Sequence, residues 1–160
     1  MKADAAKPAC DSLALIDLPV VDVAAGILWR GPRLLAAQRP GGKPLAGFWE
    51  LPGGKLEPGE SAEAALAREL AEELGVTVRE AAFWRTAGHA YPERGIRVRL
   101  HFFHVTEFDG EPAAREGQAL AWVTPKEAAG LPFLPADADI LKELQERPPA
   151  PKARRSPART

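Results

Sequence analysis

The chain has 160 residues, of which 46% are hydrophobic, and a formal net charge of −1 at pH 7. This length fits one domain of ordinary size, and the near-neutral charge argues against a duplex nucleic-acid partner and against a solvating acidic tail. No apolar run approaches the roughly 20 residues that a membrane-spanning helix requires, so we expect no membrane insertion. Because the net charge is close to zero, we also expect no stable nucleic-acid complex.

The first 18 residues show no clear hydrophobic period, and we expect a flexible N-terminal arm over 1–18. Their lysines are compatible with a signal peptide, but Asp4, Asp11 and Asp17 interrupt any apolar region. The single cysteine, Cys10, cannot form a disulfide within the chain, which fits a reducing compartment. We therefore expect a cytoplasmic protein.

Three strands are predicted before the first helix. Residues 20–29 are apolar on both faces, which indicates a central strand. A Gly-Pro turn leads to a second strand at 33–39, and a loop rich in Pro and Gly follows at 40–44. A short strand at 48–51 then runs into a glycine-rich loop.

The chain is organised around the stretch GGKLEPGESAEAALARELAEELGV at 53–76, which predicts a glycine-rich loop followed by a helix. Ser61 is a suitable N-cap, and Gly75 suits the helix end because glycine tolerates the left-handed conformation. With about 100° between successive residues, the leucines at 66, 70 and 74 form one stripe of the helix. The neighbouring stripe consists of carboxylates, Glu69, Glu72 and Glu73.

Two interpretations of the carboxylate stripe are possible. Like charges three and four residues apart repel each other, and Arg68 points about 100° away from Glu69, so we expect it to relieve little of this repulsion within the helix. A hard divalent cation such as Mg²⁺ or Mn²⁺ prefers oxygen ligands and would relieve it. The other interpretation is a Glu-rich helix face that is simply solvated.

Further strands are predicted after this helix. Residues 76–91 hold one or two strands, with Phe83 and Trp84 as expected core residues. A turn at 92–95 joins this segment to a strand at 97–107, which becomes wholly apolar near its middle.

The C-terminal part combines a strand at 119–123 with two helices. The sequence TPKE at 124–127 is a capping box with proline at the first helical position, so a short helix follows. A second helix is predicted at 137–146. From 147 to 160 the chain is basic, rich in proline and without apolar anchors, so we expect a disordered tail. These elements place the chain in the mixed α and β class.

The loop and first helix resemble the Nudix box of the Nudix hydrolases at every fixed position. The matching residues are Gly54, Glu60, Arg68, Glu69, Leu70, Glu72, Glu73, Gly75 and Val76. A match of this length is far more specific than a short glycine pattern, and it favours the metal-binding interpretation of the carboxylates.

The chain also resembles the MutT branch of that family over about residues 20–144, through AAQRP, GFWELPGGKLEPGES, DGEPAAREGQALAW and LPADADILKEL. The resemblance implies a Nudix-type α/β/α sandwich with a mixed β-sheet, in a domain at 19–146. It implies hydrolysis of a nucleoside triphosphate to the monophosphate and pyrophosphate, with Mg²⁺ or Mn²⁺ as cofactor. Several members remove oxidised nucleotides such as 8-oxo-dGTP from the precursor pool, a task allied to DNA repair.

The same resemblance implies a metal site and a general base. The metal ligands would be the carbonyl of Gly53 and the carboxylates of Glu69, Glu72, Glu73 and Glu116, the last of which comes from a later loop. Either Glu69 or Glu116 could take the proton of the attacking water, and Glu69 is our first choice.

Further residues are expected to support the phosphates and the loop. Arg39 and Lys55 resemble basic groups that lie near the phosphates. Arg68 resembles the arginine that orients a catalytic glutamate, and Glu60 and Gly54 resemble supporting residues of the box.

Asp137 and Leu51 are the candidate base-binding residues. The stretch LPAD at 134–137 stands where MutT proteins carry an asparagine that recognises 8-oxoguanine. An ionised aspartate only accepts hydrogen bonds, which suits the exocyclic amine of cytosine. A buried aspartate with a raised pKa could instead be protonated and donate to O6 of 8-oxoguanine. In a third interpretation, Asp137 only caps the terminal helix.

We therefore expect sanitation of 8-oxo-dGTP first and hydrolysis of CTP or dCTP second. Other diphosphates, such as dinucleotides, nucleotide sugars and RNA 5′ ends, are compatible with the same fold and box. A binding module without activity is disfavoured because the box is intact. We expect a monomer or a homodimer.

Several other residues offer weaker signals. His101 and His104 are three apart in a strand, so they face opposite sides and cannot chelate one ion together. With His89, they are expected to be sheet or interface residues. Trp49 could stack on a base or belong to the core.

Overall fold

Within residues 17–146, the part of the chain that this computed structural model describes, seven strands form one mixed sheet. In chain order the elements are β1 (Val20–Arg30), β2 (Arg33–Gln38), β3 (Trp49–Glu50), β4 (Gly53–Lys55), α2 (Ala62–Leu74), β5 (Thr77–Tyr91), the short 3-10 helix η1 (Pro92–Arg94), β6 (Ile96–Asp109), β7 (Ala119–Val123), α3 (Pro125–Ala128) and α4 (Pro135–Glu146). The predicted arm, up to residue 16, and the predicted tail at 147–160 lie outside the described residues.

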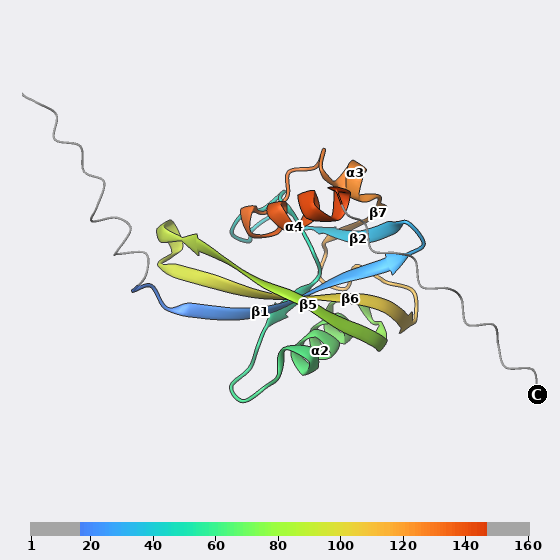
Figure 1. Ribbon diagram of the computed structural model, residues 1–160, viewed down its shortest axis with the longest axis horizontal. Helices are drawn as coiled ribbons and strands as arrows, with labels where there is room; N and C mark the ends of the chain where they lie inside the picture. Colours follow the sequence, from blue (N-terminus) through green and yellow to red (C-terminus); the bar gives the residue numbers. More distant parts are fainter. Residues whose placement is uncertain (1–16, 147–160) are drawn as a thin grey trace, which may run out of the picture.

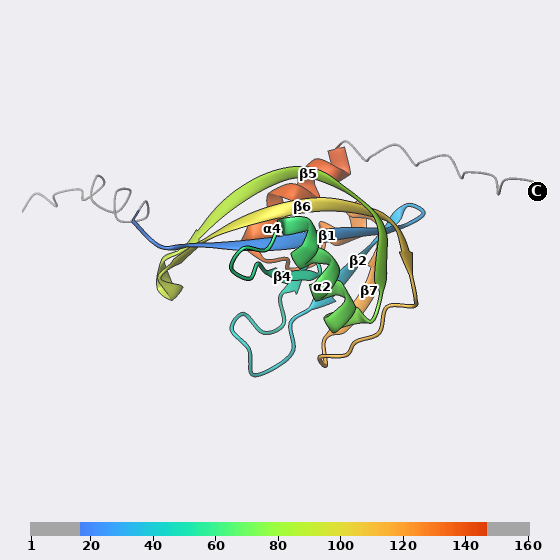
Figure 2. The ribbon, with the colours of Figure 1, turned by 90° about the horizontal axis from the view of Figure 1, so that it is seen from below.

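The helices cover both faces of the sheet. Figure 1 shows α2 below the sheet and α3 with α4 above it, and Figure 2 shows α2 lying across the strands beside β4. This arrangement is the α/β/α sandwich with a mixed sheet that was expected. Among the described residues, none of the helices has the length and apolar character that crossing a membrane requires.

Strand β1 is the centre of the sheet. It runs parallel to β6, with Val20 opposite Arg97 and Leu28 opposite Val105, and it pairs antiparallel with β2 and β4. Its residues at 24–28 are buried on both faces, as the doubly apolar pattern predicted. Strand β4 begins inside the predicted glycine-rich loop, so this loop is tied to the central strand.

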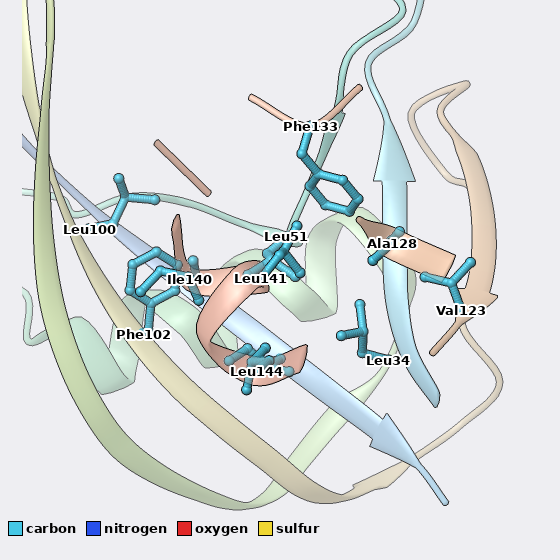
Figure 3. Packing of buried hydrophobic residues seen from close by; sticks show 13 residues of the cluster. Leu34, Leu51, Leu100, Phe102, Val123, Ala128, Phe133, Ile140, Leu141 and Leu144 are labelled. Carbon is cyan, nitrogen blue, oxygen red and sulfur yellow. The ribbon is translucent and has the colours of Figure 1, made fainter. Parts of the chain in front are cut away.

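Two hydrophobic clusters hold the layers together. On the α4 side, Ile140, Leu141 and Leu144 of α4 pack over Phe102 and Leu34 of the sheet (Figure 3). On the α2 side, the predicted leucine stripe of the helix packs on the sheet together with Ala24, Leu28, Phe103 and Val105. Helix α2 therefore turns its leucines inward and fixes its carboxylate stripe at the margin of the sheet.

The ends of the helices follow the predicted caps. The Ser61 hydroxyl accepts a hydrogen bond from the Ala64 N–H at 3.1 Å, and Gly75 adopts the left-handed conformation after the last turn of α2. The capping box of α3 is formed by Thr124 and Glu127. These local signals were confirmed because they depend on neighbouring residues alone.

The expectation that Phe83 lies in the core is wrong. Its side chain is 58% exposed and touches the ring of Phe103 edge-on, with 5.6 Å between the ring centroids. Residues 77–91 form one long strand at the edge of the sheet, so a side chain on this strand has a neighbouring strand on one side only. Trp84, by contrast, packs against the cluster on the α4 side, as expected.

Candidate active site

A cleft gathers most of the predicted site residues. Its lining includes Arg39, Leu51, Gly53, Gly54, Lys55, Glu73, Glu116 and Asp137. These residues come from β4, α2, α4 and the segments after β2, after β3 and before β7, so only the fold brings them together. Four other predicted residues, Glu60, Arg68, Glu69 and Glu72, do not line the cleft but lie beside it on the box.

Two glycines allow β4 to approach its neighbours closely. A Cβ atom on Gly53 would stand 1.9 Å from the carbonyl oxygen of Ala24, and one on Gly54 would stand 2.3 Å from the carboxyl carbon of Glu69. Both distances are far below van der Waals contact, so a side chain at Gly53 would push β4 away from the backbone of β1, and one at Gly54 would displace the carboxylate of Glu69. The glycines thus set the distance between the loop and the carboxylates.

Arg68 contacts more carboxylates than the sequence indicated. Its Nη1 donates to Glu69 Oε1 at 2.8 Å and lies 3.8 Å from Glu72 Oε2. Its Nε and Nη2 both donate to Glu60 at 2.8 Å, and Nη2 also reaches the Lys55 carbonyl. The prediction that Arg68 relieves little repulsion is therefore wrong, because its long side chain bridges the 100° between neighbouring helix positions.

Glu60 is held by this arginine. The Arg68 guanidinium, together with the backbone N–H of Glu57, lowers the pKa of the Glu60 carboxyl to about 2. Glu60 is consequently a supporting residue: it fixes Arg68, which in turn holds one oxygen of Glu69. The other oxygen of Glu69 faces Gly54.

Glu73 is the most perturbed carboxylate of the stripe. Burial, which is the largest cause, and the charges of Glu116, Glu69 and Glu50 together raise its pKa to about 8, although a hydrogen bond from the backbone of Gly53 opposes the rise. Carboxylates from α2, β3 and the loop before β7 therefore act on one another at this point of the cleft.

The remaining carboxylates are more exposed and pair with cations of the protein. The Glu72 side chain is 61% exposed. The Glu116 side chain is 45% exposed, and its Oε2 lies 3.9 Å from Nζ of Lys43. Within residues 17–146, no group of three or more His, Cys, Asp or Glu side chains stands in position to hold a metal ion together.

The donor set nonetheless suits a hard divalent cation. Glu69, Glu73 and Glu116 offer oxygen atoms alone, which is the ligand type that Mg²⁺ and Mn²⁺ prefer. Their mutual repulsion, which contributes to the raised pKa of Glu73, is what a bound cation would relieve. The residues present therefore fit such an ion.

The basic residues of the cleft include one that the sequence did not indicate. Arg39 Nη1 donates to Glu50 Oε2 at 3.0 Å, and its Nε donates to the Pro44 carbonyl at 2.8 Å. Burial raises the pKa of Glu50, although Arg39 and Lys43 oppose the rise. Lys43, in the loop before β3, lines the cleft with the predicted Lys55. No motif marked Glu50 or Lys43, because their role depends on how this loop folds over the cleft.

Asp137 is buried inside the cleft. Its side chain is 2% exposed, and Oδ2 accepts a hydrogen bond from the Leu51 N–H at 3.2 Å. Oδ1 has no hydrogen-bond partner among the described residues. Burial, with a smaller contribution from the charge of Glu50, raises the pKa of Asp137 to about 7, although the hydrogen bond from Leu51 opposes the rise.

The helix-cap interpretation of Asp137 is wrong. Helix α4 begins at Pro135, so Asp137 lies within its first turn, and its carboxylate points to β3 rather than to the free N–H groups of its own helix. The sequence placed the start of this helix two residues too late, since proline suits a first helical position.

Tyr91 and Arg94 complete the part of the cleft around Asp137. Both line it from the β5–β6 hairpin, where the Arg94 guanidinium lies 5.8 Å from the centre of the Tyr91 ring. The sequence predicted only a turn there. Apolar side chains of β1 and β6 form the adjoining wall, namely Val21, Val23, Val98 and Leu100.

The histidines and Trp49 do not line the cleft. His101 Nε2 lies 2.9 Å from Asp22 Oδ1, whereas His104 Nδ1 accepts from Trp29 Nε1 at 2.9 Å. The two histidines have separate partners, in agreement with the predicted strand geometry. Trp49 packs against the cluster on the α4 side, which confirms the core interpretation.

Comparison with known proteins agrees with this geometry. The family model described as the NUDIX domain matches residues 20–144. A CTP pyrophosphohydrolase of Escherichia coli K12 is 42% identical over 125 residues, which cover 78% of this chain and 91% of that protein. A putative 8-oxo-dGTP diphosphatase 2 of Mycobacterium tuberculosis CDC 1551 is 44% identical over 122 residues, which cover 76% and 86%.

A solved structure shows the same fold. The solution structure of the E. coli ORF135 protein superposes with a TM-score of 0.72 at 39% identity, covering 85% of this chain and 98% of that one.

Proposed function

The chain belongs to the Nudix family and is a Nudix hydrolase, and from that premise we propose that it cleaves nucleoside triphosphates to the monophosphate and pyrophosphate, with oxidised guanine nucleotides of the 8-oxo-dGTP type as its first substrates. The observation that carries this proposal is the buried Asp137, which lines the same cleft as Glu73 and Glu116 and has one buried oxygen without a hydrogen-bond partner among the described residues. In the cytoplasm, such an activity would keep oxidised nucleotides out of the precursor pool.

The carboxylates would serve the phosphate end of the substrate. Nudix hydrolases generally use divalent metal ions. In this chain the carboxylates of Glu69, Glu72, Glu73 and Glu116, with the Gly53 carbonyl, would hold Mg²⁺ or Mn²⁺, which supplies neutralisation of phosphate charge and a lowered pKa of bound water.

The chain's own residues would orient the reacting groups. Arg68 holds one oxygen of Glu69 by a 2.8 Å hydrogen bond, and the other oxygen, which lies beside Gly54, would take the proton of the attacking water. Glu116 is the alternative base. Arg39, fixed by Glu50 and the Pro44 carbonyl, lines the cleft and has three N–H donors beyond these two bonds, with which it would bind phosphate oxygens.

Asp137 would recognise the base in its protonated form. Because its pKa is about 7, the acid is populated near neutral pH, and its Oδ1 can then donate to O6 of 8-oxoguanine. The adjacent N7–H of that base can donate to Oδ2, which has a second lone pair beside the one used by Leu51. Unmodified guanine has no N7–H, so it would lose one of the two bonds.

A second candidate function is hydrolysis of CTP or dCTP. When Asp137 is ionised, its free Oδ1 is an acceptor and suits the exocyclic amine of cytosine. The similarity to a CTP pyrophosphohydrolase supports this candidate.

A substrate panel tests the proposal. We would measure kcat/KM for 8-oxo-dGTP, dGTP, CTP and dCTP by pyrophosphate release, in the parent and in Asp137→Asn. A preference for 8-oxo-dGTP supports the first candidate, and a preference for CTP or dCTP replaces it with the second. If the substitution leaves every ratio unchanged, Asp137 does not recognise the base.

A further inference from the structure

The side-chain amide of Gln118 bridges the two segments that carry Glu73 and Glu116. Its Nε2 donates to the carbonyl oxygen of Glu73 at 3.2 Å, and its Oε1 accepts from the backbone N–H of Glu116 at 2.8 Å. One side chain, situated between the loop and β7, therefore ties the backbone of both acidic residues together.

A glutamine side chain has both the length and the chemical groups to make these two hydrogen bonds at once. The Glu73 carbonyl can only accept a hydrogen bond and the Glu116 N–H can only donate one, so the bridging group must donate at one end and accept at the other. Gly117, between the two residues, has φ +75°, a conformation that favours glycine and turns the Gln118 side chain back onto Glu116.

The loop at 113–118 is docked on the C-terminal end of α2. Carbonyls in the last turn of a helix lack partners within the helix. Here the Leu74 carbonyl accepts from the Ala113 N–H at 3.0 Å, and the Ala71 carbonyl, which already accepts from the Gly75 N–H, also accepts from Nη1 of Arg115 at 3.4 Å. The loop thus satisfies the helix end, and the helix end fixes the loop.

Two residues close to Glu116 in the chain, Arg115 and Gln118, both donate hydrogen bonds to the carbonyl oxygen of Glu73. The Glu73 carbonyl oxygen accepts from the Arg115 N–H at 3.3 Å and from Gln118 Nε2 at 3.2 Å. Glu116 lies between these two residues in sequence. Its backbone is therefore fixed relative to the helix turn that carries the Glu73 carboxylate.

We propose that Gln118 is a positioning residue, which sets the separation of the Glu116 and Glu73 carboxylates and thereby the affinity of the site for a divalent cation. This inference rests on the proposed function, since it assumes that the two carboxylates share the cation. Gln118 lines the cleft, and its amide keeps one N–H and one lone pair beyond the two bonds to backbone groups, but the proposed role uses only those two bonds.

The test is the affinity for Mn²⁺ alone, measured by isothermal titration calorimetry in Gln118→Met and Gln118→Asn. Methionine keeps the length without the hydrogen bonds, and asparagine keeps the amide but is one methylene too short to reach both partners. We expect Mn²⁺ to bind about tenfold more weakly to both variants, and kcat to fall while KM stays within about twofold. The matched control is Gln145→Met, on the exposed face of α4, which should bind Mn²⁺ as the parent does.

A double variant separates positioning from general destabilisation. If Gln118 acts through Glu116, adding Gln118→Met to Glu116→Gln should cause no further loss of Mn²⁺ affinity. If Gln118→Met lowers the Mn²⁺ affinity equally in the parent and in Glu116→Gln, the inference is wrong. Parent-like Mn²⁺ affinity in Gln118→Asn would also overturn it, and this variant provides the test if Gln118→Met does not fold. If the parent itself binds no Mn²⁺, both the proposed metal site and this inference are wrong. If the parent binds Mn²⁺ and the Gln118 variants bind it with the same affinity, only this inference is wrong.

Discussion

The backbone N–H of Leu51 donates a hydrogen bond to Oδ2 of Asp137 at 3.2 Å, although the two residues are 86 positions apart in the chain. This bond ties one carboxyl oxygen to the residue that follows β3, and the other oxygen has no hydrogen-bond partner within residues 17–146. Glu50 and Tyr91 interact electrostatically with Asp137, and Arg39 and Arg94 in turn interact with Tyr91. Under the proposed function, the protonation state of this one buried acid would determine which base the cleft accepts.

This relationship predicts opposite pH trends for the two candidate substrates. As pH rises through about 7, Asp137 loses its proton, so kcat/KM for 8-oxo-dGTP should fall and that for dCTP should rise. Steady-state kinetics between about pH 6 and pH 8 measure both trends. Asp137→Asn should make their ratio independent of pH, whereas Asp139→Asn, on the exposed side of the same helix, should retain the parent's trends. Parallel trends for both substrates in the parent would rule out a titrating Asp137 as the selector.

Removing the buried carboxylate of α2 should abolish activity and stabilise the fold. We expect Glu73→Gln to lower kcat by about 100-fold or more, because the cation loses a ligand. Since burial raises the pKa of Glu73 to about 8, the neutral amide should increase the free energy of unfolding at pH 7 by about 1–3 kcal/mol in the absence of metal.

Thermal melts and turnover rates measure the two effects of Glu73→Gln. Glu63→Gln, on the exposed face of the same helix, is the matched control and should change neither. Parent-like turnover in Glu73→Gln with Mg²⁺ present would exclude Glu73 from the metal site.

His104 should contribute to acid sensitivity. Its Nδ1 accepts a hydrogen bond from Trp29, and burial lowers its pKa below the usual 6.5. The unfolded chain therefore binds a proton more readily than the fold does, so this contribution to stability is complete above about pH 6.5 and is lost as pH falls. In His104→Gln, the loss of unfolding free energy between about pH 7 and pH 5 should be smaller than in the parent, as urea denaturation at each pH would show. An equal loss in both proteins would contradict this assignment.

Two phenylalanines of similar appearance in the sequence should differ in their importance for stability. Phe102 is fully buried, and Phe102→Ala should cost about 3–5 kcal/mol. Phe83 is 58% exposed, and Phe83→Ala should cost less than about 1 kcal/mol. Urea denaturation compares the two variants directly. A cost of Phe83→Ala close to that of Phe102→Ala would mean that Phe83 is covered in solution.

Local patterns predicted the elements well because their causes are local. The caps at Ser61 and Thr124, the doubly buried strand β1 and the leucine stripe of α2 depend on neighbouring residues or on a single period. The exposure of Phe83 could not be predicted from such local patterns. It follows from the position of β5 at the sheet edge, which only the order of the strands determines.

The site residues that lie in one continuous stretch of sequence could be predicted. Those that the fold brings together from distant segments were harder to predict. Gly53, Gly54 and the carboxylate stripe belong to one stretch of sequence. The bridge from Arg68 to Glu69 was missed because the direction of the backbone says little about the reach of a long side chain. The contributions of Glu50 and Gln118 depend on contacts between distant segments, for which the sequence offers no spacing signal.

Identification of the products from 8-oxo-dGTP tests the central claim most directly. The parent, with Mg²⁺, should release 8-oxo-dGMP and pyrophosphate in equal amounts, as chromatography of the reaction would show. The reaction should stop when a chelator removes the cation, and Glu73→Gln should release neither product at a comparable rate. Release of 8-oxo-dGDP and orthophosphate, or an undiminished rate without a divalent cation, would contradict the account.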